Sequence, residues 1–218
     1  MNCFDLWVNQ WRKHPAYGDI IVVRYADDSV LGFQRKGEAT KFLSELKVRL
    51  DRFGLSLNED KTSLIRFGRF ALSAYQNQGW GKPGTFDFLG FTHVCGQKRH
   101  TKEFSLVRQT SSKRLRNVLQ KVKAWLMSNR HRPIPEQIKW LTLVMQGHMN
   151  YFAVPNNTKR LLCFRREIQK YWFKALKRRS QRFTLVWARF GAIANKVLPK
   201  IKVLHPYPEQ RFYAKYPK

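Results

Sequence analysis

The sequence predicts an α+β protein, in which a mostly antiparallel sheet with a helix precedes a helical bundle. Runs of β-branched and aromatic residues between turn signals mark the first 110 residues, whereas apolar residues recur every three or four positions after that. The charge changes at a similar place: residues 1–96 hold 13 basic and 10 acidic side chains, and residues 97–218 hold 29 basic and 4 acidic. We therefore expect a sheet region at 1–110, a helical region at 111–198 and an extended, proline- and aromatic-rich tail at 199–218.

The expected elements of the first region follow from periodicity and turn residues. A helix at Phe4–Trp11 should precede a hairpin of Ile20–Tyr25 and Ser29–Phe33, and an amphipathic helix at Glu38–Phe53 should end at Gly54. A strand at Thr62–Phe67 and a second hairpin of Thr85–Val94 and Glu103–Val107 complete the prediction.

The second region reads as four helices. Ser111 or Ser112 is the expected N-cap of the first, and the others are expected at about Pro135–Phe152, Thr158–Arg178 and Phe183–Val197. The tryptophans of this region lie in apolar helical contexts, so core packing is a better interpretation for most of them than stacking on bases. They are Trp125, Trp140, Trp172 and Trp187.

Composition limits the function classes. The chain has 218 residues and a net charge of +28, and its 43% hydrophobic and 14% aromatic content is enough for a packed core. A compact chain this basic repels itself, and a polyanion relieves the repulsion, so nucleic acid is the first expected partner. The three dispersed cysteines suggest neither a disulfide framework nor a zinc site. No apolar run predicts a membrane span and no leader is evident, so we expect a cytoplasmic or organellar-matrix protein that is not secreted.

Two adjacent carboxylates, Asp27 and Asp28, lie at the tip of the first expected hairpin. Two charges about 4 Å apart repel by roughly 4 kcal/mol at an effective dielectric constant of 20, so an ordered pair favours a bound cation. Mg²⁺ with oxygen ligands and substrate phosphates meets that requirement and is typical of phosphoryl transfer. The alternative is that aspartate is simply a common turn residue.

The segment Tyr25-Ala26-Asp27-Asp28, between two apolar strands, resembles the Y-x-D-D signature of reverse transcriptases, and in particular of group II intron-encoded reverse transcriptase/maturases. Three further blocks are similar to that family in the same order. They are residues 54–62 around Lys61, residues 86–91 with the sequence FDFLGF, and the basic helices from Lys113 onward with His205-Pro206-Tyr207-Pro208. The resemblance implies a partial palm at 1–110 followed by a helical thumb, or maturase domain X, at 111–198.

The resemblance also implies roles for single residues. Asp27 and Asp28 would be the catalytic ligands of Mg²⁺, and Lys61 would position or protonate the pyrophosphate leaving group; an ordinary surface lysine is the alternative. Phe88, Leu89 and Gly90 would form the primer grip, or else a strand interior. Tyr25 would pack beneath the nascent base pair, or serve only as a strand aromatic.

The basic helices are expected to bind RNA, although charge runs are often only solvated faces. The first helix contributes Lys113, Arg114, Arg116, Lys121 and Lys123, and the third contributes Arg165, Arg166, Lys170, Lys174, Lys177, Arg178, Arg179 and Arg182. His148, Tyr151 and Asn156 are further candidates for RNA contact.

In the family the metal site also uses an aspartate from an earlier strand, and no such block is present in this sequence. Asp5 lies on the expected first helix and is not its replacement. The resemblance thus implies part of an RNA-directed DNA polymerase and maturase whose partners are group II intron RNA, an RNA template, a DNA primer and dNTP. We expect the chain alone not to polymerise. The alternatives are a non-catalytic RNA-binding maturase module and one half of a split or decayed reverse transcriptase, with a second chain supplying fingers and front palm.

Overall fold

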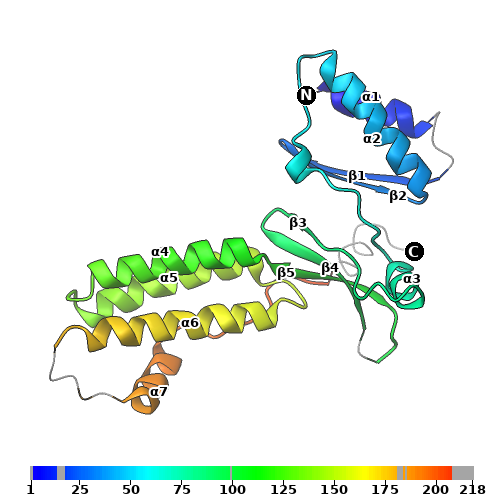
Figure 1. The fold of residues 1–218 in the computed structure, drawn as a ribbon. Helices are drawn as coiled ribbons and strands as arrows, with labels where there is room; N and C mark the ends of the chain where they lie inside the picture. The colour runs from blue at the N-terminus through cyan, green and yellow to red at the C-terminus, as the bar shows by residue number, and fades with distance from the viewer. Residues whose placement is uncertain (1, 14–17, 99, 181–183, 185, 208–218) are drawn as a thin grey trace. The chain divides into compact units, whose positions relative to one another are not determined.

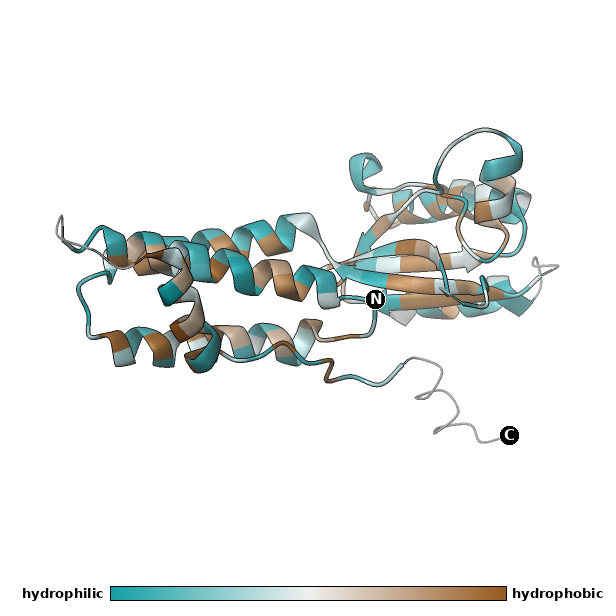
Figure 2. Cartoon of the chain, turned by 90° about the horizontal axis from the view of Figure 1, so that it is seen from below, coloured by the Kyte–Doolittle hydropathy of each residue, from teal (hydrophilic) through white to brown (hydrophobic). Residues whose placement is uncertain are grey.

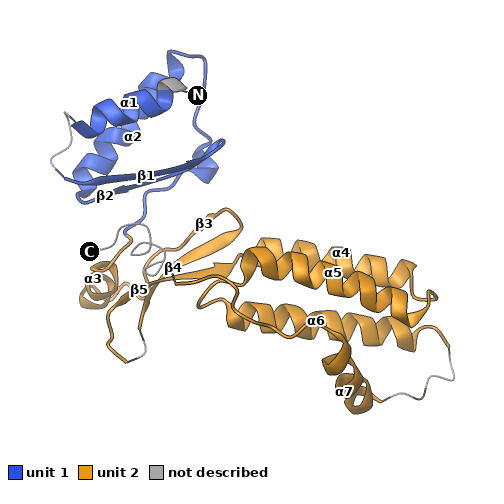
Figure 3. Ribbon diagram, turned by 180° about the vertical axis from the view of Figure 1, so that it is seen from behind, with its two compact units in different colours: residues 1–66 blue, residues 67–218 orange. Residues whose placement is uncertain are grey.

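The computed structural model describes residues 2–13, 18–98, 100–180, 184 and 186–207. The chain forms two compact units, Met1–Arg66 and Phe67–Lys218 (Figure 3). The boundary expected near residue 110 therefore falls inside the second unit, where the last strand of a sheet leads into a helix.

The first unit is a hairpin covered on one face by two helices (Figure 1). Its elements are α1 (Asn2–Lys13), β1 (Ile20–Tyr25), β2 (Asp28–Phe33), α2 (Lys36–Asp51) and a 3₁₀ turn, η1 (Glu59–Lys61). β1 and β2 are antiparallel, with Ile20 opposite Phe33 and Tyr25 opposite Asp28.

Alternation along β1 decides which side chains enter the core of the first unit. Ile20 packs with Trp11 of α1 and Phe42 of α2, whereas the opposite face of β1 exposes Ile21 and Tyr25. This period of two follows from strand geometry, and it leaves one face of the hairpin outside the core of this unit.

The second unit joins a three-stranded antiparallel sheet to a helical bundle (Figure 1). A short helix α3 (Ala71–Asn77) precedes strands β3 (Phe86–Phe88), β4 (Phe91–Gln97) and β5 (Phe104–Thr110), in the sheet order β3-β4-β5. The helices are α4 (Ser112–Ser128), α5 (Ile134–Phe152), α6 (Thr158–Lys177) and α7 (Trp187–Val197).

The bundle is held by a core to which all four of its helices contribute. Leu126, Leu141, Phe164, Trp172 and Phe190 are each at most 2% exposed. Hydrophobic and hydrophilic residues alternate in bands along these helices (Figure 2), as expected where one stripe of each helix is buried.

The α+β prediction is confirmed, and so are the first hairpin, the Ser111 N-cap and the four helices. The hydroxyl of Ser111 accepts from the backbone N–H of Arg114, as the sequence predicts. Trp172 is buried, and the rings of Trp125 and Trp140 stack 3.8 Å apart in the partly buried shell of the core. Trp187 is 43% exposed but contacts the ring of Phe173.

Two strand predictions are wrong. Residues 62–67 form no strand, because strand propensity takes effect only where another strand pairs with the segment, and these residues span the boundary between the two units. The strand expected at Thr85–Val94 is two strands, because Leu89 and Gly90 adopt positive φ angles of 50° and 76° and reverse the chain. The short helix α3 was not predicted.

The described part of the tail, from Pro199 to Tyr207, has no helix or strand, and residues 208–218 lie outside the described residues. Within the described part of the chain, no helix is both long enough and apolar enough to cross a membrane. Cys95 and Cys163 are free thiols.

Candidate functional site

The carboxylate pair sits at a two-residue turn. Tyr25 and Asp28 face each other as the last pair of the β1–β2 ladder, so Ala26 and Asp27 alone reverse the chain. Ala26 has φ of 52°, which is the left-handed region that L residues adopt at a cost of about 1–2 kcal/mol. A strained alanine is therefore held at the point where the two carboxylates are presented.

The neighbouring Arg24 holds this turn through hydrogen bonds to Asp5 and to the turn itself. Its Nε donates to Asp5 Oδ1 at 2.9 Å and its Nη2 donates to Asp5 Oδ2 at 2.5 Å, while its Nη1 donates to the carbonyl of Ala26 at 3.2 Å. The same guanidinium thus ties α1 to the turn. Both oxygens of Asp5 accept hydrogen bonds from this fork.

Asp27 and Asp28 are both exposed. Their carboxylate oxygens are the donors that Mg²⁺ prefers, and Mg²⁺ in proteins commonly takes one or two carboxylates and completes its shell with water and substrate phosphates. Across the described residues, no group of three or more His, Cys, Asp or Glu side chains gathers to hold a metal. The pair therefore fits a magnesium ion as a partial ligand set.

Lys61 ends the 3₁₀ turn η1, whose N-cap Asn58 accepts from the Lys61 backbone N–H through its side chain. The Lys61 side chain is exposed. Tyr25 is 66% exposed on the face of β1 that turns away from the two helices. Both roles derived from the resemblance stay predictions for these residues.

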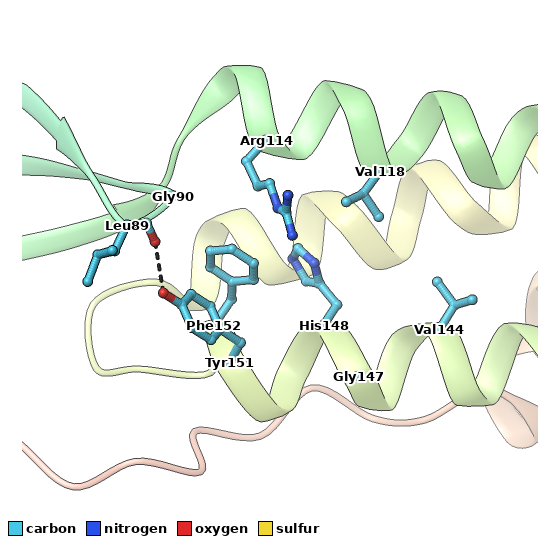
Figure 4. A pocket seen from close by; sticks show the side chains of 9 residues that line it. All are labelled: Leu89, Gly90, Arg114, Val118, Val144, Gly147, His148, Tyr151 and Phe152. Carbon is cyan, nitrogen blue, oxygen red and sulfur yellow. Dashed lines mark hydrogen bonds between the residues drawn. The ribbon is translucent and has the colours of Figure 1, made fainter. Parts of the chain in front are cut away.

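The residues predicted as a primer grip form the turn between β3 and β4. Phe88 and Phe91 are the flanking pair of the ladder, and Leu89 and Gly90 make a tight turn in which both φ angles are positive. The hydroxyl of Tyr151 on α5 donates to the carbonyl of Leu89 at 3.0 Å (Figure 4). We refer to Phe88, Leu89 and Gly90 as the grip turn.

A buried amide attaches this sheet to the bundle. Asn157, just before α6, accepts from the backbone N–H of Thr110 at 2.9 Å and donates to the Thr110 hydroxyl at 2.8 Å and to the carbonyl of Phe152 at 2.7 Å. Asn157 and Thr110 are both fully buried. The sequence predicted possible RNA contact for the adjacent Asn156, which is exposed with φ of 70°, and missed Asn157. A single polar residue at a helix start gave no signal of its long-range partner.

The basic residues of the bundle fall into two groups. Arg165 donates to the carbonyl of Pro199 and to Asn195, Arg179 donates to the carbonyl of Arg132, and Lys170 pairs with Glu167 at 2.6 Å. Burial also lowers the pKa of Arg165. Arg165 and Arg179 thus bind other segments of the second unit, whereas Lys170 pairs with a neighbour on α6.

The other predicted cations are exposed on α4, on α6 or directly after α6: Lys113, Arg114, Arg116, Lys121, Lys123, Arg166, Lys174, Lys177 and Arg178. Arg182 lies outside the described residues. These exposed cations can meet phosphates, and we call the nine residues together the basic surface.

The first unit thus presents paired carboxylates at the tip of a hairpin, and the second carries a basic helical bundle. A family model described as Reverse transcriptase (RNA-dependent DNA polymerase) matches residues 2–93. The matched stretch contains the whole carboxylate hairpin and the grip turn. No curated protein matches the chain.

Proposed function

We propose that this chain forms the rear palm and thumb of an RNA-directed DNA polymerase of the group II intron type, with a maturase role in RNA splicing. One observation carries the proposal: Asp27 and Asp28 sit at a two-residue hairpin turn inside the stretch that the reverse transcriptase model matches. Such a protein acts where intron RNA is made, in a bacterial cytoplasm or an organellar matrix.

Four residues of the first unit have a defined task under this proposal. Asp27 and Asp28 hold Mg²⁺, which when bound supplies charge stabilisation for the attacking and leaving oxygens of nucleotidyl transfer. Arg24 keeps the turn in place through Asp5 and the Ala26 carbonyl. Lys61 supplies a cation, and a proton, to the departing pyrophosphate of the dNTP.

The two carboxylates are an incomplete ligand set for two metal ions, so we propose that a third carboxylate comes from fingers and front palm supplied by further residues or a second chain. Primer extension on an RNA template tests this. The purified chain should give no product alone, and should give Mg²⁺-dependent product when mixed with a chain that supplies fingers and front palm. Robust extension by the chain alone would contradict the proposed division of the site.

A second candidate function is a non-catalytic RNA-binding maturase module. The basic surface favours it, because its nine exposed cations lie on or directly beside only two helices. Under this alternative, intron RNA binding depends steeply on salt and is unaffected by Asp27→Ala. The logarithm of affinity should fall by roughly 0.7–0.9 per decade of salt for each phosphate contacted.

A matched pair of variants locates that binding. Changing Lys113, Arg116, Lys121 and Lys123 to Gln together should reduce the salt slope and weaken RNA binding. The same charge change at Arg35, Lys36, Lys41 and Arg52, which are exposed in the first unit, should have a much smaller effect. Equal losses from the two quadruple variants would show that net charge, and not the basic surface, binds the RNA.

A third possibility is that the open reading frame is decayed. In that case RNA binding persists, and no complementing chain restores synthesis.

A further inference from the structure

A cavity of about 570 Å³ opens between the grip turn, α4 and α5, within the second unit (Figure 4). Its walls are largely apolar and include Val118, Val144 and Phe152. Its volume falls in the range of roughly 300–1,000 Å³ typical of small-ligand pockets. Leu89 and Gly90 of the grip turn and Arg114 of the basic surface also line it, but no role assigned so far concerns the apolar space between them.

One wall of the cavity carries a buried polar atom that has no partner. His148 is 7% exposed, and its Nε2 makes no hydrogen bond within the described part of the chain. The imidazole lies against the rings of Phe152 and Phe164, with centroids 4.6 and 4.0 Å away, so its orientation is fixed. An unpaired buried polar atom of this kind destabilises the fold, and a ligand that forms a hydrogen bond with it would remove that penalty.

The rim of the cavity carries a cation. Arg114 of α4 is exposed, and its guanidinium extends toward the His148 ring (Figure 4). A second hollow of about 450 Å³ shares Arg114 and Val118 with the first and is also lined by Asn117 and Lys121 of α4. The two hollows are therefore neighbours along α4. The apolar cavity holds the unpaired polar atom of His148, and Arg114 and Lys121 supply cations next to it.

These features match a flat heterocycle that carries a phosphate. A free phosphate would leave the apolar walls unfilled, and a purely apolar ligand would leave Nε2 of His148 unpaired. We infer that this cavity receives the base of one unpaired nucleotide of a bound RNA, with its phosphate at Arg114 and the strand continuing over Lys121. The inference rests on the proposed RNA binding and names a site for a single nucleotide within it.

The test compares three RNA duplexes by fluorescence anisotropy at one salt concentration: one with a single bulged adenosine, one with an abasic residue at the bulge, and one fully paired. The base should add about tenfold in affinity over the abasic bulge, in line with the worth of a stacked base. A bulged 2-aminopurine should change its fluorescence on binding.

Two glycines give a matched pair of variants. A Cβ at Gly147, which lines the cavity, or at Gly191 on α7 would meet nothing within 4 Å, so each helix accepts a larger side chain. Gly147→Leu should fill the cavity and abolish the preference for the bulged base, and Gly191→Leu should retain it. Circular dichroism confirms that both variants are folded.

Equal affinity for the bulged base and the abasic bulge, with binding otherwise intact, would overturn the inference and leave the proposed RNA binding standing. A tenfold preference that survives Gly147→Leu would place the base elsewhere and would also overturn it. Failure of the native chain to bind any of the three RNAs would instead contradict the proposed function, and the inference with it.

Discussion

Arg24 binds Asp5 through both carboxylate oxygens and reaches the carbonyl of Ala26 with its remaining Nη atom. Three parts of the first unit, α1, β1 and the carboxylate turn, thus meet at one guanidinium. The planar fork of arginine makes this arrangement possible, because lysine cannot donate to both oxygens in a fixed plane.

Asp5→Asn should therefore loosen the turn. The pair is partly exposed, with 25% of the Arg24 side chain and 40% of the Asp5 side chain accessible, so we expect a loss of only about 1 kcal/mol in the free energy of unfolding. Urea denaturation measures it. Asp51→Asn, at an exposed carboxylate of α2, is the control and should change stability by no more than a few tenths. Equal effects of the two changes would show that the fork contributes nothing.

The left-handed Ala26 predicts opposite effects for two substitutions. Glycine adopts φ of 52° freely, so Ala26→Gly removes the strain of the left-handed alanine. Glycine also gains conformational entropy in the unfolded chain, which offsets part of this gain, so the free energy of unfolding should rise by about 0.5–1 kcal/mol. A β-branched residue is strongly disfavoured there, so Ala26→Val should lower it by about 1 kcal/mol or more. A stabilising valine would contradict the turn geometry.

His148 predicts a pH dependence of stability. Burial, and secondarily the charge of Arg114, lowers the pKa of His148 from 6.5 to about 4 in the folded chain. The unfolded chain binds the proton first, so the free energy of unfolding should fall as pH drops below about 6.5. The loss should be complete, at up to about 3 kcal/mol, near pH 4.

His148→Phe removes that titration. The difference in the free energy of unfolding between native chain and variant should change by about 3 kcal/mol between pH 7 and pH 4, measured by chemical denaturation at each pH. Parallel curves for the native chain and His148→Phe would contradict the burial of a neutral imidazole.

The amide of Asn157 predicts a large penalty for its removal. Asn157→Ala leaves the backbone N–H and hydroxyl of Thr110 and the carbonyl of Phe152 without this partner in a fully buried place. We expect a loss of about 2–4 kcal/mol in the free energy of unfolding. Asn156→Ala, at the exposed neighbour, should cost far less; a comparable loss there would contradict the assigned network.

Much of the fold could be predicted because its signals are local. The Ser111 cap answers the unpaired N–H groups at a helix start, and the apolar spacing of α4 to α6 reflects a helix face that must be buried. Both were predicted, as was the β-branched, apolar run of β1. The division of the sheet region could not be predicted in the same way. Leu89 and Gly90 lie in an apolar run that reads as a single strand. The Phe88–Phe91 ladder pair, the Tyr151 hydroxyl at the Leu89 carbonyl and the Ser111 N–H at the Gly90 carbonyl hold them in a turn.

The carboxylate hairpin was predictable because a short turn between apolar strands has a clear sequence pattern, although Asp28, expected in the turn, is already paired in β2. The buried polar groups were not. Gln137 on α5 accepts from the indole N–H of Trp172 and donates to carbonyls of residues 129, 130 and 132, yet its position in the sequence looks like any polar helix residue. A contact between residues 35 positions apart produces no periodic pattern in the sequence, so this hydrogen-bond network could be found only in the structure.

Primer extension by the complemented chain tests the central claim most directly. With fingers and front palm supplied by a second chain, the native protein should extend a DNA primer on an RNA template in the presence of Mg²⁺. Asp27→Asn and Asp28→Asn should each abolish the product, while Asp60→Asn, at another exposed carboxylate of the first unit, should retain it. Extension that survives the loss of Asp27 or Asp28 would contradict the assignment of these two residues as the metal ligands.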